Sequence, residues 1–278
     1  MFEAFFGLQA APFQLSPDPG FLFESRGHSQ ALAYLKYGVY QREGFVVVTG
    51  EIGAGKTTLV RALLEGLDAQ QLVAAQISNT QLDETELLAS ICHAFGVPVP
   101  GESKAQRIAA LEAFFTTLAA SGRRALLVVD EAQNLGRRQV EELRMLSNFQ
   151  LGRQALLQSF LVGQPELREM LASPALEQLR QRVIAACHLG PMSEAETCHY
   201  VEHRLRLAGH SGAPIFGAAA LTQIFVATGG LPRRINLLCN RLLLAAYLAG
   251  RAQVDAALVQ TTAAELQQEF GLPKAGPA

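Results

Sequence analysis

The sequence lacks the cysteine pattern and the targeting segment of a secreted protein. Its four cysteines, Cys92, Cys187, Cys198 and Cys239, have no paired short spacing, which indicates reduced core thiols rather than a disulfide framework. The N-terminus has no basic region ahead of a long apolar stretch and carries Glu3 early, so we expect no secretory signal. A cytoplasmic location is therefore favoured.

The sequence also lacks a strong charge of either sign and an uninterrupted apolar run. The formal net charge of −2 gives no bulk attraction to phosphate polymers or anionic lipid, so nucleic acid is not favoured as a partner. The most apolar long stretch, residues 231–248, is interrupted by three arginines and two asparagines, which indicates a buried amphipathic helix rather than a membrane span. Any membrane role would then depend on a partner protein.

What is present describes an ordinary globular chain with an α/β fold. The 278 residues, 49% hydrophobic and 17% charged, suffice for one large and one smaller unit. Short apolar runs that alternate with helical patterns predict a parallel sheet covered on both faces. The predicted strands are residues 45–49, 72–77, 125–129, 159–162 and 183–189. The predicted helices include residues 28–42, 194–207, 218–228, 231–249 and 254–269.

These patterns divide the chain into domains. Strand signals end near Ser193, after which only helical patterns follow. We therefore predict an α/β nucleotide-binding domain over residues 1–190 and a helical domain over residues 191–268. Residues 269–278 are rich in proline and glycine and are expected to form a flexible tail.

A glycine-rich segment between the first predicted strand and the next helix fits the P-loop pattern. Its residues are Gly50, Glu51, Ile52, Gly53, Ala54, Gly55, Lys56, Thr57 and Thr58. The glycines let the backbone approach phosphate oxygens closely, and the following helix directs its positive end at the anion. Lys56 is expected to neutralise the β- and γ-phosphates, and the Thr57 hydroxyl is expected to bind Mg²⁺.

Two adjacent carboxylates follow the buried strand at residues 125–129. The strand delivers Asp130 and Glu131 to the carboxyl edge of the sheet, where parallel α/β folds bind ligands. Asp130 is expected to hold Mg²⁺, while Glu131 polarises the water that attacks the γ-phosphate. An isolated Asp-Glu pair is also a common helix N-cap, but its combination with the P-loop favours the catalytic interpretation.

Further polar residues are candidates for the same reaction. Gln164 ends another predicted strand; if that strand lies beside the P-loop strand, Gln164 could orient the water or contact the γ-phosphate, and the alternative is a turn residue before proline. Arg180 or Arg182 could act across a subunit interface, or could simply be solvated. Arg233 is preferred over Arg234 as the residue that reaches the nucleotide from the helical domain.

Together these motifs resemble the AAA+ ATPases of the ExeA-like general secretion pathway component A family, over about residues 1–268. Residues 142–150 and the brief tail resemble the short, stand-alone members found in exosortase (PEP-CTERM, XrtA) loci. The matching blocks are residues 5–8, 12–13, 16–19, 50–58, 129–134, 163–167 and 230–236.

The resemblance implies a central five-stranded sheet followed by a helical lid, with ATP and Mg²⁺ as cofactors and nucleotide at the interfaces of a homo-oligomer. It assigns Gln164 to sensor one, Arg180 or Arg182 to the arginine finger and Arg233 to sensor two. It also places His28 in the adenine pocket. Longer family members continue into a membrane span and a peptidoglycan-binding part, which we do not expect from this sequence.

The leading functional hypothesis is an ATP-hydrolysing motor or switch that serves envelope export. It would be cytoplasmic, recruited to the inner membrane through a secretion or polysaccharide-export partner. A transposition-helper or DNA-loading ATPase is the alternative, because such proteins share this organisation; it requires salt-sensitive DNA binding that stimulates hydrolysis. A third possibility is a nucleotide-dependent interaction module with almost no turnover.

Overall fold

A computed structural model describes residues 2–16, 19–78, 80, 82–99, 101 and 103–270. Pro17 and Asp18 of the N-terminal block, and tail residues 271–278, lie outside this range. The chain forms two compact units. The sheet unit contains residues 29–50 and 59–189, and the helical unit contains residues 1–28, 51–58 and 190–278. The helical unit therefore includes the N-terminal segment and the P-loop as well as the C-terminal helices.

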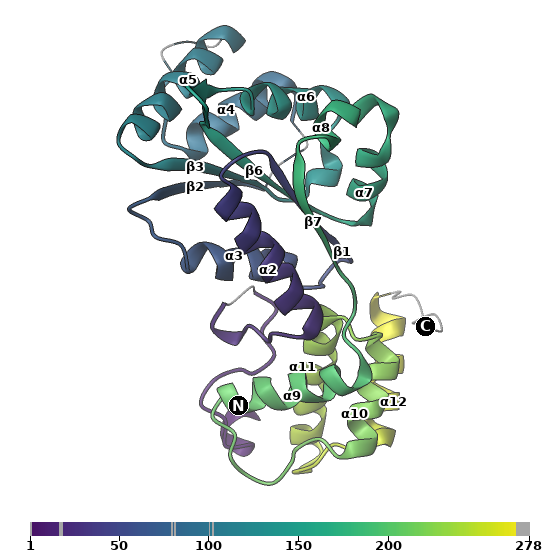
Figure 1. Ribbon diagram of the computed structural model, residues 1–278. Helices are drawn as coiled ribbons and strands as arrows, with labels where there is room; N and C mark the ends of the chain where they lie inside the picture. Colours follow the sequence, from purple (N-terminus) through teal and green to yellow (C-terminus); the bar gives the residue numbers. More distant parts are fainter. Residues whose placement is uncertain are drawn as a thin grey trace. The chain divides into compact units, whose positions relative to one another are not determined.

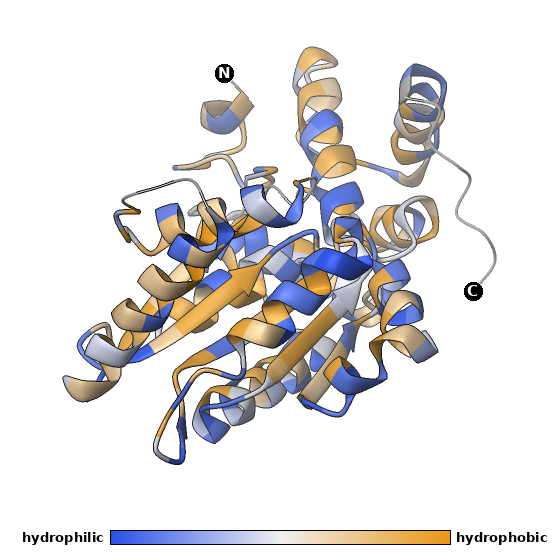
Figure 2. Cartoon of the chain, turned by 90° about the horizontal axis from the view of Figure 1, so that it is seen from above, coloured by the Kyte–Doolittle hydropathy of each residue, from blue (hydrophilic) through white to orange (hydrophobic). Residues whose placement is uncertain are grey.

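The sheet unit is built on five parallel strands in the order β2-β3-β6-β1-β7, so the predicted α/β class and parallel sheet are confirmed (Figure 1). The strands are β1 (Phe45–Gly50), β2 (Leu72–Ile77), β3 (Arg124–Val129), β6 (Leu157–Gly163) and β7 (Val183–Leu189). Figure 2 shows strands coloured orange for hydrophobic side chains, as expected for a sheet buried on both faces. Two short strands, β4 (Gln150–Leu151) and β5 (Gln154–Ala155), form a separate antiparallel pair.

Helices cover both faces of this sheet because alternate strand residues point to opposite sides. In β1, Phe45 and Val47 enter the core shared with helices α4, α5 and α6, whereas Val46 lies against Gly38 of α2. The helices that contribute to this unit are α2 (Arg26–Gln41), α3 (Lys56–Glu65), α4 (Glu84–Ala94), α5 (Lys104–Ala120), α6 (Arg137–Leu146), α7 (Pro165–Ala172) and α8 (Glu177–Arg180). Short 3-10 turns are η2 (Ala132–Asn134) and η3 (Pro174–Leu176).

The helical unit packs its C-terminal helices around a second apolar core, and the predicted helices in this region are confirmed. Its elements are α1 (Phe2–Phe5), η1 (Pro19–Phe21), α9 (Glu194–Leu207), α10 (Ala218–Thr228), α11 (Pro232–Leu248) and α12 (Ala256–Phe270). Phe6 and Phe13 of the N-terminal segment are buried in this core. Arg204 of α9 donates a hydrogen bond from Nε to the carbonyl of Pro12, which holds the segment in place.

No helix within the described residues is long and apolar enough to cross a membrane. The predicted apolar stretch at residues 231–248 is the buried helix α11, with Ile235, Leu242 and Leu243 in the core. All four cysteines are free.

Candidate nucleotide site

The P-loop leaves β1 at Gly50 and has the backbone of an anion cradle. Gly53 and Gly55 have φ values of 81° and 95°, which side-chain-bearing residues adopt only with strain. The loop closes on the Glu51 carbonyl, which accepts hydrogen bonds from the Ala54 backbone N–H at 3.1 Å and from Lys56 Nζ at 3.0 Å. Helix α3 begins at Lys56, so its positive end faces the loop. This geometry fits a bound phosphate group.

The remaining predicted P-loop residues take ordinary positions. Gly50 is required at the end of β1 because a Cβ there would lie 2.5 Å from the Leu189 carbonyl oxygen. Ile52 is exposed at the tip of the loop. Thr57 and Thr58 lie in the first turn of α3.

His28 holds the P-loop from the N-terminal segment of the same unit. Its Nε2 lies 3.1 Å from the Ala54 carbonyl, which can only accept, so Nε2 carries the proton and donates. Nδ1 then accepts from the Ser25 hydroxyl at 2.7 Å. Burial lowers the pKa of His28, against the opposing effects of the Ala54 carbonyl and Glu196, which keeps the ring neutral. Its predicted adenine contact stays a prediction.

Arg233 holds the loop from helix α11. Its backbone N–H donates to the Gly53 carbonyl at 3.1 Å, and a Cβ on Gly53 would lie 2.4 Å from the Arg233 Cβ. The neighbouring Arg234 instead lines a cavity with Ala227 and Leu266, between α10, α11 and α12. The structure therefore joins Arg233, and not Arg234, to the P-loop.

In the sheet unit, Asp130 and Glu131 follow β3 in a tightly held turn. Asp130 is buried, and its Oδ1 accepts from the Glu131 backbone N–H at 3.0 Å. Glu131 has φ 51° and ψ 38°, a left-handed conformation that costs about 1–3 kcal/mol for a residue other than glycine. The Glu131 carbonyl accepts from the buried Thr80 hydroxyl at 2.9 Å. Such strain clusters at functional sites.

The structure brings Gln164 to Glu131. Strand β6 lies between β3 and the P-loop strand β1, as the role considered for Gln164 requires. Gln164 Nε2 donates to Glu131 Oε2 at 3.1 Å. Gln164 therefore contacts the carboxylate that is expected to polarise water.

Sequence reasoning assigned no role to Gln133, which completes this cluster. Its Nε2 donates to Glu131 Oε2 at 2.5 Å, and its Oε1 accepts from the Gln164 backbone N–H at 3.0 Å. The position of Gln133 two residues after Glu131 does not predict these contacts, because they form only when β3 pairs with β6. We call Glu131, Gln133 and Gln164 the strand-end cluster.

The two candidate arginine-finger residues lie elsewhere in the sheet unit. Arg180 is exposed and donates to the Ala172 carbonyl at 3.2 Å. Arg182 is half-buried and donates to the Ser147 hydroxyl at 3.1 Å, beside the end of α6. Both arginines therefore donate hydrogen bonds within their own chain, and they differ in exposure: Arg180 is exposed and Arg182 is half-buried.

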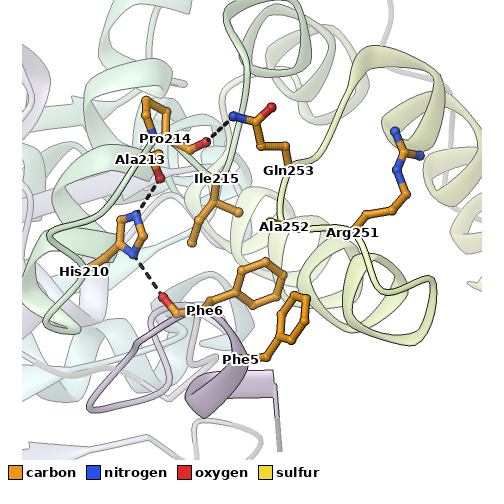
Figure 3. A pocket seen from close by; sticks show the side chains of 9 residues that line it. All are labelled: Phe5, Phe6, His210, Ala213, Pro214, Ile215, Arg251, Ala252 and Gln253. Atoms are coloured by element: carbon orange, nitrogen blue, oxygen red, sulfur yellow. Dashed lines mark hydrogen bonds between the residues drawn. The ribbon is translucent and has the colours of Figure 1, made fainter.

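A separate cavity of about 570 Å³ lies in the helical unit, and Figure 3 shows its lining. His210 uses both ring nitrogens on backbone carbonyls, those of Phe6 at 3.1 Å and Ala213 at 3.0 Å. Arg251 pairs with Asp255. The polar groups at this cavity connect parts of the unit to one another, and none of its lining residues is a predicted site residue.

The fold and this site define a class of protein. A parallel sheet in the order β2-β3-β6-β1-β7, with a phosphate loop after β1 and carboxylates after β3, is that of an AAA+ P-loop ATPase. Residues 39–171 match the model of a family described as AAA domain. The chain is an ATPase with this fold.

Over 256 residues, the chain is 43% identical to General secretion pathway protein A of Aeromonas hydrophila. The match covers 91% of this chain and 46% of the relative, so the chain spans about half of that protein's length. These matches support an AAA ATPase similar to that protein.

Solved structures share the fold. Cdc6p from Pyrobaculum aerophilum matches with a TM-score of 0.67 and 18% identity, over 98% of this chain and 74% of that one. The Drosophila ORC bound to DNA matches with a TM-score of 0.65 and 24% identity, over 87% and 60%. Thermotoga maritima RuvB matches with a TM-score of 0.60 and 19% identity, over 92% and 72%. At these identities the likeness concerns the fold alone.

Proposed function

We propose that this chain is an ATP-hydrolysing motor or switch that supports envelope export, of the type found in exosortase loci. The observation that carries the proposal is the 43% identity to a general secretion pathway protein over 91% of the chain. The proposed location is the cytoplasm, at the inner membrane through a secretion or polysaccharide-export partner.

In this proposal the P-loop binds ATP and the strand-end cluster serves hydrolysis. Lys56 would contact the β- and γ-phosphates, and the Thr57 hydroxyl and Asp130 carboxylate would hold Mg²⁺, which prefers hard oxygen ligands. When bound there, Mg²⁺ would supply positive charge beside the phosphates. Glu131 accepts the proton of the attacking water, and Gln164 orients that carboxylate through its 3.1 Å hydrogen bond.

Arg233 is the proposed link between nucleotide state and the lid, which we assign to residues 191–268 of the predicted domains. Its backbone N–H already binds the P-loop at Gly53, which supports this role. The Arg233 guanidinium is therefore no farther from the P-loop than the length of its own side chain. A change in phosphate charge would therefore act on α11 at its first turn.

We propose further that the active form is a homo-oligomer in which Arg180 acts as the arginine finger. An arginine donated to a neighbouring site must be free to leave its own subunit, and Arg180 is exposed. Arg182 is the weaker candidate because it is half-buried and its guanidinium donates to both the hydroxyl and the carbonyl of Ser147, whereas Arg180 donates only to the Ala172 carbonyl among the hydrogen bonds described.

The experiment that tests this function has two arms. In the native host, a strain that lacks the gene is complemented with the wild type or with Lys56→Ala, and exported polysaccharide or protein is measured. The proposal predicts that only the wild type restores export; restoration by Lys56→Ala would overturn the requirement for ATP. In vitro, specific ATPase activity should rise with protein concentration. This rise should be reduced more by Arg180→Ala than by Arg182→Ala.

A DNA-loading or transposition-helper ATPase is the alternative, because such proteins share this ATPase organisation; the Drosophila ORC, whose structure was solved bound to DNA, has the same fold. The same hydrolysis assay distinguishes it. Duplex DNA should stimulate turnover, with loss of stimulation at higher salt, if the alternative holds. If turnover ignores DNA while export depends on Lys56, the secretion function stands.

A further inference from the structure

We infer that Gln133 is a positioning residue that clamps the catalytic carboxylate of Glu131 to the strand end that carries Gln164. The inference rests on the proposed role of Glu131 in hydrolysis and names Gln133 as a residue that supports that role.

Both ends of the Gln133 side-chain amide make hydrogen bonds. Gln133 Nε2 donates to Glu131 Oε2, and Gln133 Oε1 accepts from the Gln164 backbone N–H at 3.0 Å. A backbone N–H can only donate and a carboxylate can only accept, so the two contacts fix which end of the amide is oxygen. Gln133 is thus held in one orientation, and it bridges the turns that follow β3 and β6.

This bridge is possible because Gln133 approaches the end of β6 closely. Gly163, the last residue of β6, has no side chain, and a Cβ there would lie 2.7 Å from Gln133 Oε1. The absence of that atom admits the amide oxygen to the end of β6. The contact is therefore built into the ends of two adjacent strands rather than formed by a side chain in solvent.

Glu131 itself is held in a restricted conformation. Its backbone is left-handed at φ 51°, and its Oε2 accepts from both Gln133 and Gln164. Two amide donors on one oxygen restrict the rotation of the carboxylate, and a misplacement of about 1 Å in a reacting group can lower a rate by about 100-fold. Gln133 acts on hydrolysis through the orientation of Glu131 and has no proposed contact with nucleotide.

The test compares variants of the full chain in ATP hydrolysis and ATP binding. Gln133→Glu keeps an acceptor for the Gln164 N–H but removes the donor to Glu131 and adds a like charge. Gln133→Met removes both hydrogen bonds without adding charge. Gln139→Glu is the matched control, since Gln139 donates to the Leu82 backbone carbonyl and not to the cluster. Expected results are a kcat lower by about 10- to 100-fold for Gln133→Glu, a smaller fall for Gln133→Met and an unchanged KM and Kd for ATP.

A double-mutant cycle separates positioning from a structural role. If Gln133 acts through Glu131, then Gln133→Glu should not lower the residual rate of Glu131→Gln any further. A kcat of Gln133→Glu within about twofold of the wild type, or a full additive loss in the double variant, would overturn the inference. So would an equal loss in Gln139→Glu. These assays use the chain alone, so failure of the export proposal, which concerns a partner, would leave their outcomes unchanged.

Discussion

The P-loop and the strand-end cluster are built in different ways, although both are proposed to serve ATP hydrolysis. The P-loop is shaped by its backbone: glycines at φ 81° and 95°, with carbonyls held by His28 and by the Arg233 N–H. The strand-end cluster is shaped by side chains, since two glutamine amides orient one carboxylate. A backbone site tolerates few residue types, whereas a side-chain site depends on the pairing of particular neighbours.

This difference assigns separate kinetic signatures to the two regions. Changes in the P-loop should weaken nucleotide binding, because they alter the surface that meets the phosphates. Changes in the strand-end cluster should lower kcat with little effect on binding, because the Glu131 carboxylate is proposed to act in the transition state.

The largest contrast is expected between Lys56→Ala and Glu131→Gln. Glu131→Gln removes the proposed general base, a group that typically contributes about 100- to 10,000-fold to the rate, and should retain ATP binding. Lys56→Ala removes the buried ammonium of the loop and should abolish binding as well as turnover. Equilibrium binding of a fluorescent ATP analogue and steady-state hydrolysis measure the two effects. If Glu131→Gln weakens binding as much as Lys56→Ala, the separation of roles is wrong.

The next largest effect is expected from Gly53→Ala, with Gly122→Ala as its control. Both glycines have positive φ, but a Cβ on Gly122 would meet nothing within 4 Å, whereas one on Gly53 would meet Arg233. Gly122→Ala should cost about 1–2 kcal/mol for the left-handed backbone alone. Gly53→Ala should cost about 1–3 kcal/mol more because of the overlap, and it should weaken ATP binding. Urea unfolding measures the loss of unfolding free energy in both variants. Equal losses would show that Arg233 moves away from the added Cβ at no cost in stability.

The sequence predicted the parts of this molecule that depend on local pattern. The five strands of the sheet and the C-terminal helices followed from periodicity, and β2 and β7 have the predicted bounds. The P-loop was readable because its glycines encode a backbone shape. Gln133 was not, because its amide joins two turns that become neighbours only when β3 pairs with β6. Likewise, nothing near His28 in the sequence indicates its hydrogen bond to Ala54.

A smaller effect should distinguish Arg233 from Arg234. The Arg233 contact with Gly53 uses the backbone N–H, which Arg233→Ala retains, so the loop should keep its shape. Loss of the guanidinium should then weaken ATP binding by about 10-fold, as expected for one charge-assisted hydrogen bond. Arg234→Ala should leave ATP affinity unchanged, because Arg234 lines the cavity beside α10 and α12. Isothermal titration measures both affinities, and a larger loss in Arg234→Ala would exchange the two assignments.

The smallest effect concerns the pH dependence of stability through His28. Burial lowers the pKa of the folded imidazole below its ordinary value near 6.5, so the unfolded chain binds the proton more readily. The stabilisation from the neutral ring is fully present above the unfolded pKa and is lost as the pH falls below it. His28→Gln keeps a donor for the Ala54 carbonyl but does not titrate, so its Tm should fall less than that of the wild type between pH 7.5 and pH 5.5. His93→Gln is the control, because His93 is exposed. Parallel Tm curves for wild type and His28→Gln would show that the contact between His28 and the P-loop survives protonation. The stability of the P-loop would then not depend on the charge of His28.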